Sequence, residues 1–205
     1  MDSVAKVAEI ARIDLTQDSL KWVLASVAFN PIFWNIVARL EYKTKVLTKI
    51  AGSPKLGCYL LAFTIFSLGI FRDYLYELAL RDQPTCVYLN TIYGKVAGAV
   101  LFACGNVLVL TSMWALGVTG TYLGDYFGIL MDHRVTSFPF NVSNNPMYHG
   151  STLSFLGTAL WFAKPAGIAI SVFVFVMYSI ALVFEEPFTA EIYAKRDRER
   201  AKKAN

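Results

Sequence analysis

Residues 96–124 read VAGAVLFACGNVLVLTSMWALGVTGTYLG and contain no charged side chain. A transmembrane helix needs about 20 predominantly apolar residues to cross the roughly 30 Å hydrocarbon core of a bilayer. This run is therefore long enough to span a membrane as a helix. It predicts an integral membrane protein, and the other segments of the chain can be placed relative to it.

The composition of the whole chain indicates the same class. Of its 205 residues, 56% are hydrophobic and 17% are charged, whereas a soluble domain is about 45–50% apolar and about 25% charged. The net charge of +4 is small, and the basic residues gather in two segments beside apolar runs, 39–55 and 195–203. Such clusters commonly lie against anionic lipid headgroups and set the topology of membrane proteins. We therefore expect a lipid environment and no nucleic-acid partner.

The remaining apolar runs predict how often the chain enters the membrane. We expect membrane segments at residues 56–80 and 96–118, followed by a C-terminal helical hairpin at 150–184 that turns near Lys164. The three cysteines show no metal-binding spacing, so no metal site is expected. The predicted fold is all-α, a polytopic integral membrane helical bundle that forms one domain over residues 1–205.

Four further segments complete this prediction. Residues 1–21 carry charged and apolar side chains at helical spacing, which is typical of an amphipathic helix lying on a surface. The run 22–38 is uncharged but contains a proline and two asparagines, so it either spans the membrane or re-enters it. We expect a loop at 39–55 and a charged cytosolic tail at 185–205.

The two ends of the hairpin should share one side of the membrane, because a hairpin returns to the side that it left. The loop at 125–149 and the pair Glu185-Glu186 would then face the same compartment. By the positive-inside rule, the basic tail at 195–203 makes this compartment the cytosol. The basic segment at 39–55 falls on the same side, so two separate clusters agree on the topology.

Polar motifs stand at both ends of the hairpin. Residues 144–148 read NNPMY, which has the residues of a turn followed by the start of a helix, and a loop with a helix cap would account for it. Glu185 and Glu186 directly follow an apolar run, where a carboxylate pair is costly without a cationic partner or water. Interfacial charge at a helix end would account for the pair. A pocket shared by both motifs would instead give them a function.

Four motifs carry a family resemblance: Leu123-Gly-Asp-Tyr-Phe-Gly-Ile-Leu130, Phe138-Pro-Phe-Asn141, Asn145-Pro-Met-Tyr148 and Glu185-Glu-Pro-Phe-Thr-Ala-Glu-Ile-Tyr193. Together they resemble the phospholipid N-methyltransferases, which are related to the isoprenylcysteine carboxyl methyltransferases. Residues 30–39, NPIFWNIVAR, are similar to the fungal members that act on the monomethylated lipid. The resemblance covers the chain from Phe29 to Tyr193.

This resemblance implies an enzyme with S-adenosylmethionine as its methyl donor. It would methylate the amine of phosphatidyl-N-methylethanolamine and phosphatidyl-N,N-dimethylethanolamine, giving phosphatidylcholine. The implied location is the endoplasmic reticulum membrane, with several membrane passes and an active site toward the cytosol, and a mitochondrial membrane is the alternative. The phospholipid would reach the enzyme within the bilayer. The preference among unmethylated, monomethyl and dimethyl lipids and the oligomeric state stay open.

The resemblance also supplies candidate site residues, because carboxylates and tyrosine faces can hold a sulfonium cation and an amine must lose its proton before it attacks. The catalytic candidates are Glu186, Tyr148 and Asp125, with His149 as a further proton acceptor. The cofactor-binding candidates are Cys104, Gly105, Asn145, Tyr148, Glu185 and Glu186, and the candidates for the substrate phosphate are Arg134 and Arg39. The family pattern has Gly-x-Gly where this chain has Ala103-Cys104-Gly105, so helix packing is the alternative role there.

Three other functions fit parts of the pattern. A sterol-reductase-like enzyme would share the hairpin, but such enzymes close with a tyrosine- and cysteine-containing tail, and residues 194–205 contain no cysteine. An isoprenylcysteine methyltransferase-like enzyme would share the Glu-Glu pair. A non-enzymatic scaffold or channel would make that pair dispensable, and a channel needs polar rings along its spans.

Overall fold

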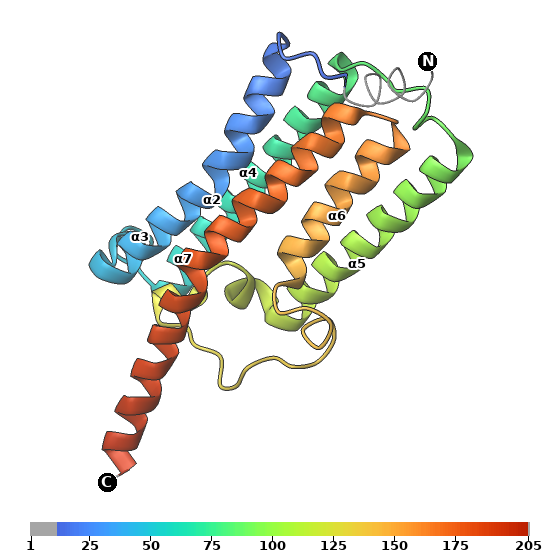
Figure 1. The fold of residues 1–205 in the computed structure, drawn as a ribbon. Coiled ribbons are helices and arrows are strands. Elements are labelled where there is room, and N and C mark those ends of the chain that lie inside the picture. The colour runs from blue at the N-terminus through green and yellow to red at the C-terminus, as the bar shows by residue number, and fades with distance from the viewer. Residues whose placement is uncertain (1–11, 205) are drawn as a thin grey trace.

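The computed structural model describes residues 12–204, which fold into helices joined by loops (Figure 1). Five long helices form the body of the molecule: α2 (Asp18–Thr44), α4 (Pro54–Asp82), α5 (Ile92–Thr121), α6 (Pro146–Trp161) and α7 (Pro165–Ala204). Two short helices accompany them, α3 (Val46–Ala51) and the 3-10 helix η1 (Gly124–Phe127). No strand occurs between residues 12 and 204, which confirms the predicted all-α class.

The starts of the long helices follow from local sequence. Ser53 before α4 and Thr91 before α5 each accept a hydrogen bond from a backbone N–H of the first turn, at 3.2 and 3.1 Å. A cap of this kind pairs one of the N–H groups that a helix start leaves without a partner. Pro54, Pro146 and Pro165 occupy the first residue of α4, α6 and α7, where the fixed φ of proline suits a helix and its missing N–H is not needed.

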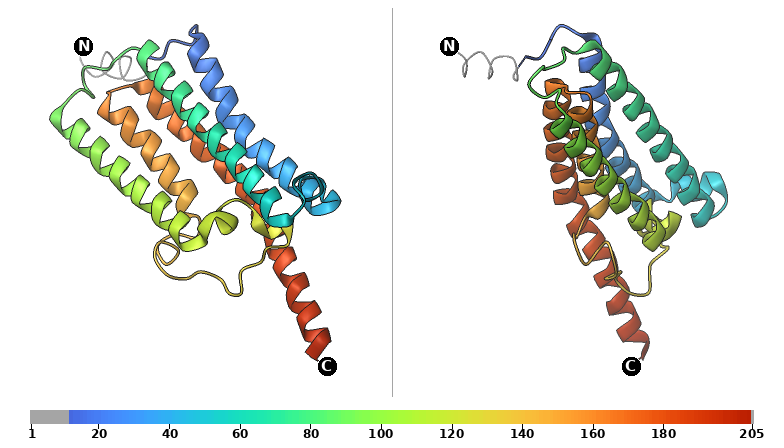
Figure 2. Two further views of the ribbon diagram at one scale, coloured as in Figure 1. Left: turned by 180° about the vertical axis from the view of Figure 1, so that it is seen from behind. Right: turned by 90° about the vertical axis from the view of Figure 1, so that its right-hand side faces the viewer.

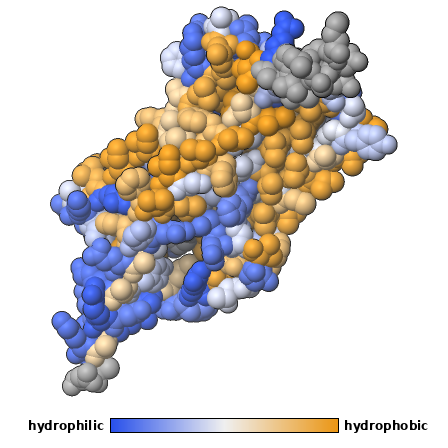
Figure 3. Space-filling view, viewed as in Figure 1, coloured by the Kyte–Doolittle hydropathy of each residue, from blue (hydrophilic) through white to orange (hydrophobic). Residues whose placement is uncertain are grey.

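Four of the helical segments are long and apolar enough to cross a membrane: α2, α4, residues 92–127 and α7. Figure 3 shows hydrophobic residues over the sides of the bundle and hydrophilic residues toward its two ends. Large apolar side chains point outward from the helices, for example Phe63 at 71% exposed and Trp114 at 91% exposed. Lipid can cover such surfaces, and the arrangement is that of a polytopic helical membrane protein.

The run 22–38 lies within one unbroken helix, α2. The amide nitrogens of its two asparagines find partners without a break in the helix. Asn30 Nδ2 donates to the carbonyl of Leu68 on α4 at 3.2 Å, and Asn35 Nδ2 donates to the carbonyl of Pro31 at 3.1 Å. Pro31 is buried inside the helix. These contacts account for the residues that suggested re-entry, and we keep a full span as the prediction for α2.

The predicted loop at 39–55 is wrong. Helix α2 continues to Thr44, and α3 occupies residues 46–51. The two helices are joined at Lys45, which has a left-handed φ of 58°. Glu41 is fully buried and accepts a 2.7 Å hydrogen bond from the backbone N–H of Leu47. The sequence shows a basic cluster with one acid, and only the fold reveals that this acid caps the next helix.

The expected amphipathic helix over residues 1–21 can be compared only in part, because residues 1–11 lie outside the described residues. Its described portion is not helical between residues 12 and 17. Asp14 holds a turn there: its carboxylate accepts hydrogen bonds from the Thr16 backbone N–H and from its hydroxyl, at 2.9 and 2.6 Å. Short polar side chains often compete with helix in this way, and α2 begins only at Asp18.

Helices α5 and α6 approach each other closely through glycines. A Cβ atom on Gly105 would lie 2.4 Å from the carbonyl oxygen of Gly150, and one on Gly157 would lie 2.6 Å from the carbonyl oxygen of Gly98. Small residues allow such backbone contact between membrane helices. Helices α6 and α7 form the predicted hairpin, and Figures 1 and 2 show α7 continuing beyond the bundle to the C-terminus.

Candidate active site

A cleft of about 750 Å³ lies at the end of the bundle where α5 ends and α6 begins. Its walls come from the last turn of α5, η1, the loop at 128–145, the first residues of α6 and one face of α7. This volume suits a cofactor-sized ligand, since such sites usually measure about 300–1,000 Å³. Hydrophilic residues gather at the same end of the molecule (Figure 3).

The chain turns into the cleft through a break in α5. Gly117 has a left-handed φ of 64° and interrupts the helix, and Leu123 at φ 60° starts η1. At Gly117 this φ costs no strain, because glycine has no Cβ atom. The turn brings Asp125 into the cleft wall, which Thr189 of α7 also lines. Asp125 is half-buried, so its carboxylate can face the cleft from the end of α5.

Tyr148 and Glu185 meet at the inner wall. The Tyr148 hydroxyl donates a short hydrogen bond to Glu185 Oε2. Tyr148 lies in the first turn of α6, and Glu185 lies where α7 leaves the bundle. The hairpin therefore joins its two ends through these side chains, which places a carboxylate against a tyrosine ring.

Asn145 and Glu186 form a second link across the same mouth. Asn145 Nδ2 donates to Glu186 Oε1 at 2.8 Å. The backbone N–H of Asn145 in turn donates to Ser143 Oγ at 3.1 Å, which holds the loop against the start of α6. Both acids of the pair thus contact the Asn-Pro-Met-Tyr motif. Glu186 is the more exposed of the two.

Two arginines line the outer part of the cleft. Arg134 is exposed and approaches Asn144 Oδ1 at 3.4 Å. Arg196 is 17% exposed at its side chain and donates to the carbonyl of Met131 at 2.6 Å. A guanidinium binds phosphate oxygens well, so this end of the cleft suits an anionic group.

The structure brings together six of the predicted site residues, which all line the cleft: Asp125, Arg134, Asn145, Tyr148, Glu185 and Glu186. Four others lie outside the cleft lining. Cys104 is exposed on α5, and Gly105 packs against α6. Arg39 donates to the carbonyl of Phe184 at 2.6 Å and lies over the Phe188 ring. His149 is exposed and pairs with Ser143 Oγ at 2.7 Å, outside the cleft lining.

Residues of the tail were missed as site candidates. Thr189, Tyr193 and Arg196 line the cleft, although the segment after Glu185 was expected to be a solvated tail. They follow Glu185 at intervals of three or four residues, which places them on one face of a continuous helix. Helical spacing measured from the Glu-Glu pair could have found them.

Comparison with known proteins gives a consistent result. The family profile described as phospholipid methyltransferase matches residues 93–196. The chain is 64% identical to phosphatidyl-N-methylethanolamine N-methyltransferase of Emericella nidulans, with 93% of each protein covered. It is 59% identical to the protein of the same name from Saccharomyces cerevisiae, with 96% of this chain and 97% of that protein covered.

A mammalian relative extends the comparison. The chain is 46% identical to phosphatidylethanolamine N-methyltransferase of Homo sapiens, with 90% of this chain and 92% of that protein covered. No solved structure matches the chain. The matched profile includes every residue that lines the cleft, and the relatives cover nearly the full length. The chain therefore belongs to the phospholipid methyltransferase family.

Proposed function

We propose that this enzyme transfers methyl groups from S-adenosylmethionine to phosphatidyl-N-methylethanolamine and phosphatidyl-N,N-dimethylethanolamine, giving phosphatidylcholine. The observation that carries the proposal is the convergence of Tyr148, Glu185 and Glu186 on one cleft at the end of an apolar bundle. The names of the fungal relatives support the choice of the monomethylated lipid. Membership of the family argues against the sterol-reductase-like and non-enzymatic alternatives.

The donor fits the inner wall of the cleft. S-adenosylmethionine, when bound, supplies a methyl group on a sulfonium cation. Glu185 and the ring of Tyr148 would hold this positive charge through Coulombic and cation–π attraction. Asn145 would add hydrogen bonds from its amide, which already contacts Glu186. Cys104 and Gly105 lie outside the cleft lining, so we leave them out of the proposed donor site.

The amine must be neutral to attack the methyl carbon, because its lone pair forms the new C–N bond while the C–S bond breaks. We assign the removal of the amine proton to Glu186, which is exposed at the mouth of the cleft and can pass the proton to water. Asp125, which also lines the cleft, would hold the ammonium that precedes this step. Alignment of amine and methyl group in the cleft would supply much of the rate.

The lipid phosphate would lie on Arg134 at the outer part of the cleft. Arg196 is a second candidate that the structure adds, since it lines the same end. Arg39 is less suitable because it is not among the residues that line the cleft, and its guanidinium contacts Phe184 and Phe188. The acyl chains would remain among the apolar ends of α5 and α7, where Leu116 and Leu182 line the cleft.

The orientation in the membrane follows from charge. The basic clusters are the segment 39–55, which includes α3, and the C-terminal part of α7. Helix α3 and this part of α7 lie toward the cleft end of the bundle (Figures 1 and 2). By the positive-inside rule, these clusters support a cleft that faces the cytosol. The endoplasmic reticulum membrane remains part of the proposal through the family resemblance alone.

One assay tests the proposed function. The full chain would be purified into lipid nanodiscs and given labelled S-adenosylmethionine with unmethylated, monomethyl or dimethyl ethanolamine phospholipid, each offered separately. We expect label in the monomethyl and dimethyl lipids. Label in none of the three would overturn the proposal, and label in the unmethylated lipid alone would overturn the assigned substrates.

A further inference from the structure

A charged side chain lies deep inside the helical bundle, away from the cleft lining. Arg72 is on α4, ten residues before the end of the helix at Asp82, which corresponds to about 15 Å along the axis. Its side chain is only 12% exposed. An ionisable residue at membrane depth is costly, and it usually has a functional reason.

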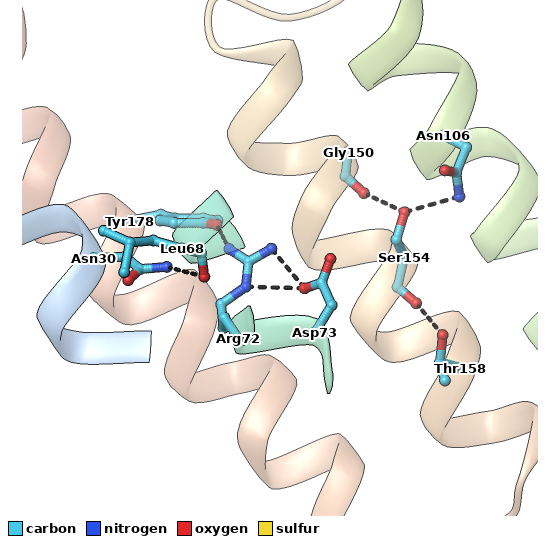
Figure 4. Close-up of polar contacts among 9 residues, drawn as sticks. All are labelled: Asn30, Leu68, Arg72, Asp73, Asn106, Gly150, Ser154, Thr158 and Tyr178. Atoms are coloured by element: carbon cyan, nitrogen blue, oxygen red, sulfur yellow. Dashed lines mark hydrogen bonds and ion pairs between the residues drawn. The ribbon is translucent and has the colours of Figure 1, made fainter. Parts of the chain in front are cut away.

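Arg72 contacts side chains of α4, α6 and α7, and Figure 4 shows its bonds to Asp73 and Tyr178. Its Nε and Nη2 donate to Asp73 Oδ1 at 3.0 and 2.8 Å, which balances the charge. Its Nη1 donates to the hydroxyl of Tyr178 on α7, and its guanidinium lies 4.9 Å from the ring centroid of Phe155 on α6. Charge balance needs only Asp73. The bond to Tyr178 therefore has a separate consequence, which is to fix where that hydroxyl points.

Tyr178 lies between Arg72 and the active site. Its ring meets the ring of Tyr148 edge to face, with centroids 4.9 Å apart and an interplanar angle of 73°. Trp34 of α2 closes the cluster, at 6.3 Å from Tyr178 and 6.4 Å from Tyr148. Tyr178 is 6% exposed, so the cluster is packed. Of these residues only Tyr148 lines the cleft.

We propose that Arg72 and Tyr178 are positioning residues for methyl transfer. Arg72 fixes the Tyr178 ring, Tyr178 fixes the ring of Tyr148, and the Tyr148 hydroxyl holds Glu185 at the donor wall of the cleft. Side chains behind an active site commonly hold it in this way through packing and hydrogen bonds. The inference rests on the proposed function, because it assigns Tyr148 and Glu185 to the methyl donor.

Tyr178→Phe gives the cleanest test, because it removes the hydroxyl that binds Arg72 and keeps the ring. We expect the Kd for S-adenosylmethionine to rise about fivefold to tenfold, the net effect of one lost hydrogen bond. The KM for the lipid should stay the same, because Arg134 and Arg196 are at the other end of the cleft. Arg72→Met should give a similar rise, and the double variant should add little to either single change.

Arg81→Met is the matched control. Arg81 is on the same helix, is 69% exposed, and pairs only with Glu77 among the ion pairs described. We expect its donor Kd and lipid KM to equal those of the unchanged protein. Thermal unfolding in the same nanodiscs separates positioning from stability, since a merely structural role would lower the melting temperature of Tyr178→Phe and leave the donor Kd of the folded protein unchanged.

The donor Kd is measured without turnover, so this test and that of the proposed function can fail separately. A protein that binds the donor but methylates none of the three lipids would overturn the proposed function. A Tyr178→Phe variant with an unchanged donor Kd would overturn the positioning role. Effects of Arg72→Met and Tyr178→Phe on the donor Kd that simply add would overturn it as well.

Discussion

Gly105 has two possible roles, close packing of α5 against α6 and contact with the methyl donor. Replacing it tests which of the two applies. In Gly105→Ala the new Cβ would lie 2.4 Å from the Gly150 carbonyl oxygen and 2.5 Å from Ser154 Oγ. Neither distance is tolerable, and the Gly150 oxygen belongs to backbone, so α5 and α6 must move apart. Overpacking of this kind typically costs about 1–3 kcal/mol.

Two other glycines serve as controls. Gly98→Ala meets the Gly157 carbonyl at 2.7 Å and should cost a similar amount, although it lies at the far end of the contact from the cleft. Gly69→Ala on α4 meets nothing within 4 Å and should be neutral or slightly stabilising. Thermal unfolding in nanodiscs is the assay, with donor Kd measured on the same samples.

The outcome decides between two roles for Gly105. We predict that Gly105→Ala and Gly98→Ala both lower the melting temperature by several degrees, while Gly69→Ala does not. If Gly105→Ala kept its melting temperature and lost donor binding, the packing argument would be refuted, and the glycine would instead lie against the donor.

The remaining predictions concern charge and topology. Arg134→Gln should raise the lipid KM about tenfold and leave the donor Kd unchanged, because the variant loses one charged hydrogen bond to the lipid phosphate. An unchanged lipid KM would assign the phosphate to Arg196 instead. Asn141, in an Asn-Val-Ser acceptor pattern, should carry no glycan in cells, because the proposed topology puts the cleft end on the cytosolic side. A glycosidase-sensitive mass shift would reverse the topology.

Much of the architecture could be predicted from the sequence. The charge-free run at 96–124 has the length of helix that a bilayer requires, and the structure has α5 there. The interruption near Lys164 predicted a turn between two helices, and the structure has α6 before it and α7 after it. The prediction of a loop at 39–55 failed because composition does not show that Glu41 caps α3. A buried cap is a tertiary contact, and charge counts cannot reveal it.

Site residues could be predicted from the sequence only where residues of the local motifs contact one another in the folded structure. Asn145, Tyr148, Glu185 and Glu186 meet because a hairpin returns to its own start. Cys104 and Gly105 were candidates from a motif alone, and in the structure Gly105 lies where α5 packs against α6. Arg196 was missed because charged residues beyond a membrane span look solvated, and only the unbroken course of α7 brings it to the cleft.

The central claim is that methyl transfer takes place in this cleft, with Glu186 as proton acceptor. The most direct measurement is the single-turnover rate of methylation of the monomethyl lipid by Glu186→Gln, beside Glu191→Gln as a control. Glu191 is an exposed acid on the same helix, outside the cleft lining. We predict a fall of about 10²-fold or more for Glu186→Gln at saturating donor and an unchanged rate for Glu191→Gln. Equal rates in both variants would contradict the account.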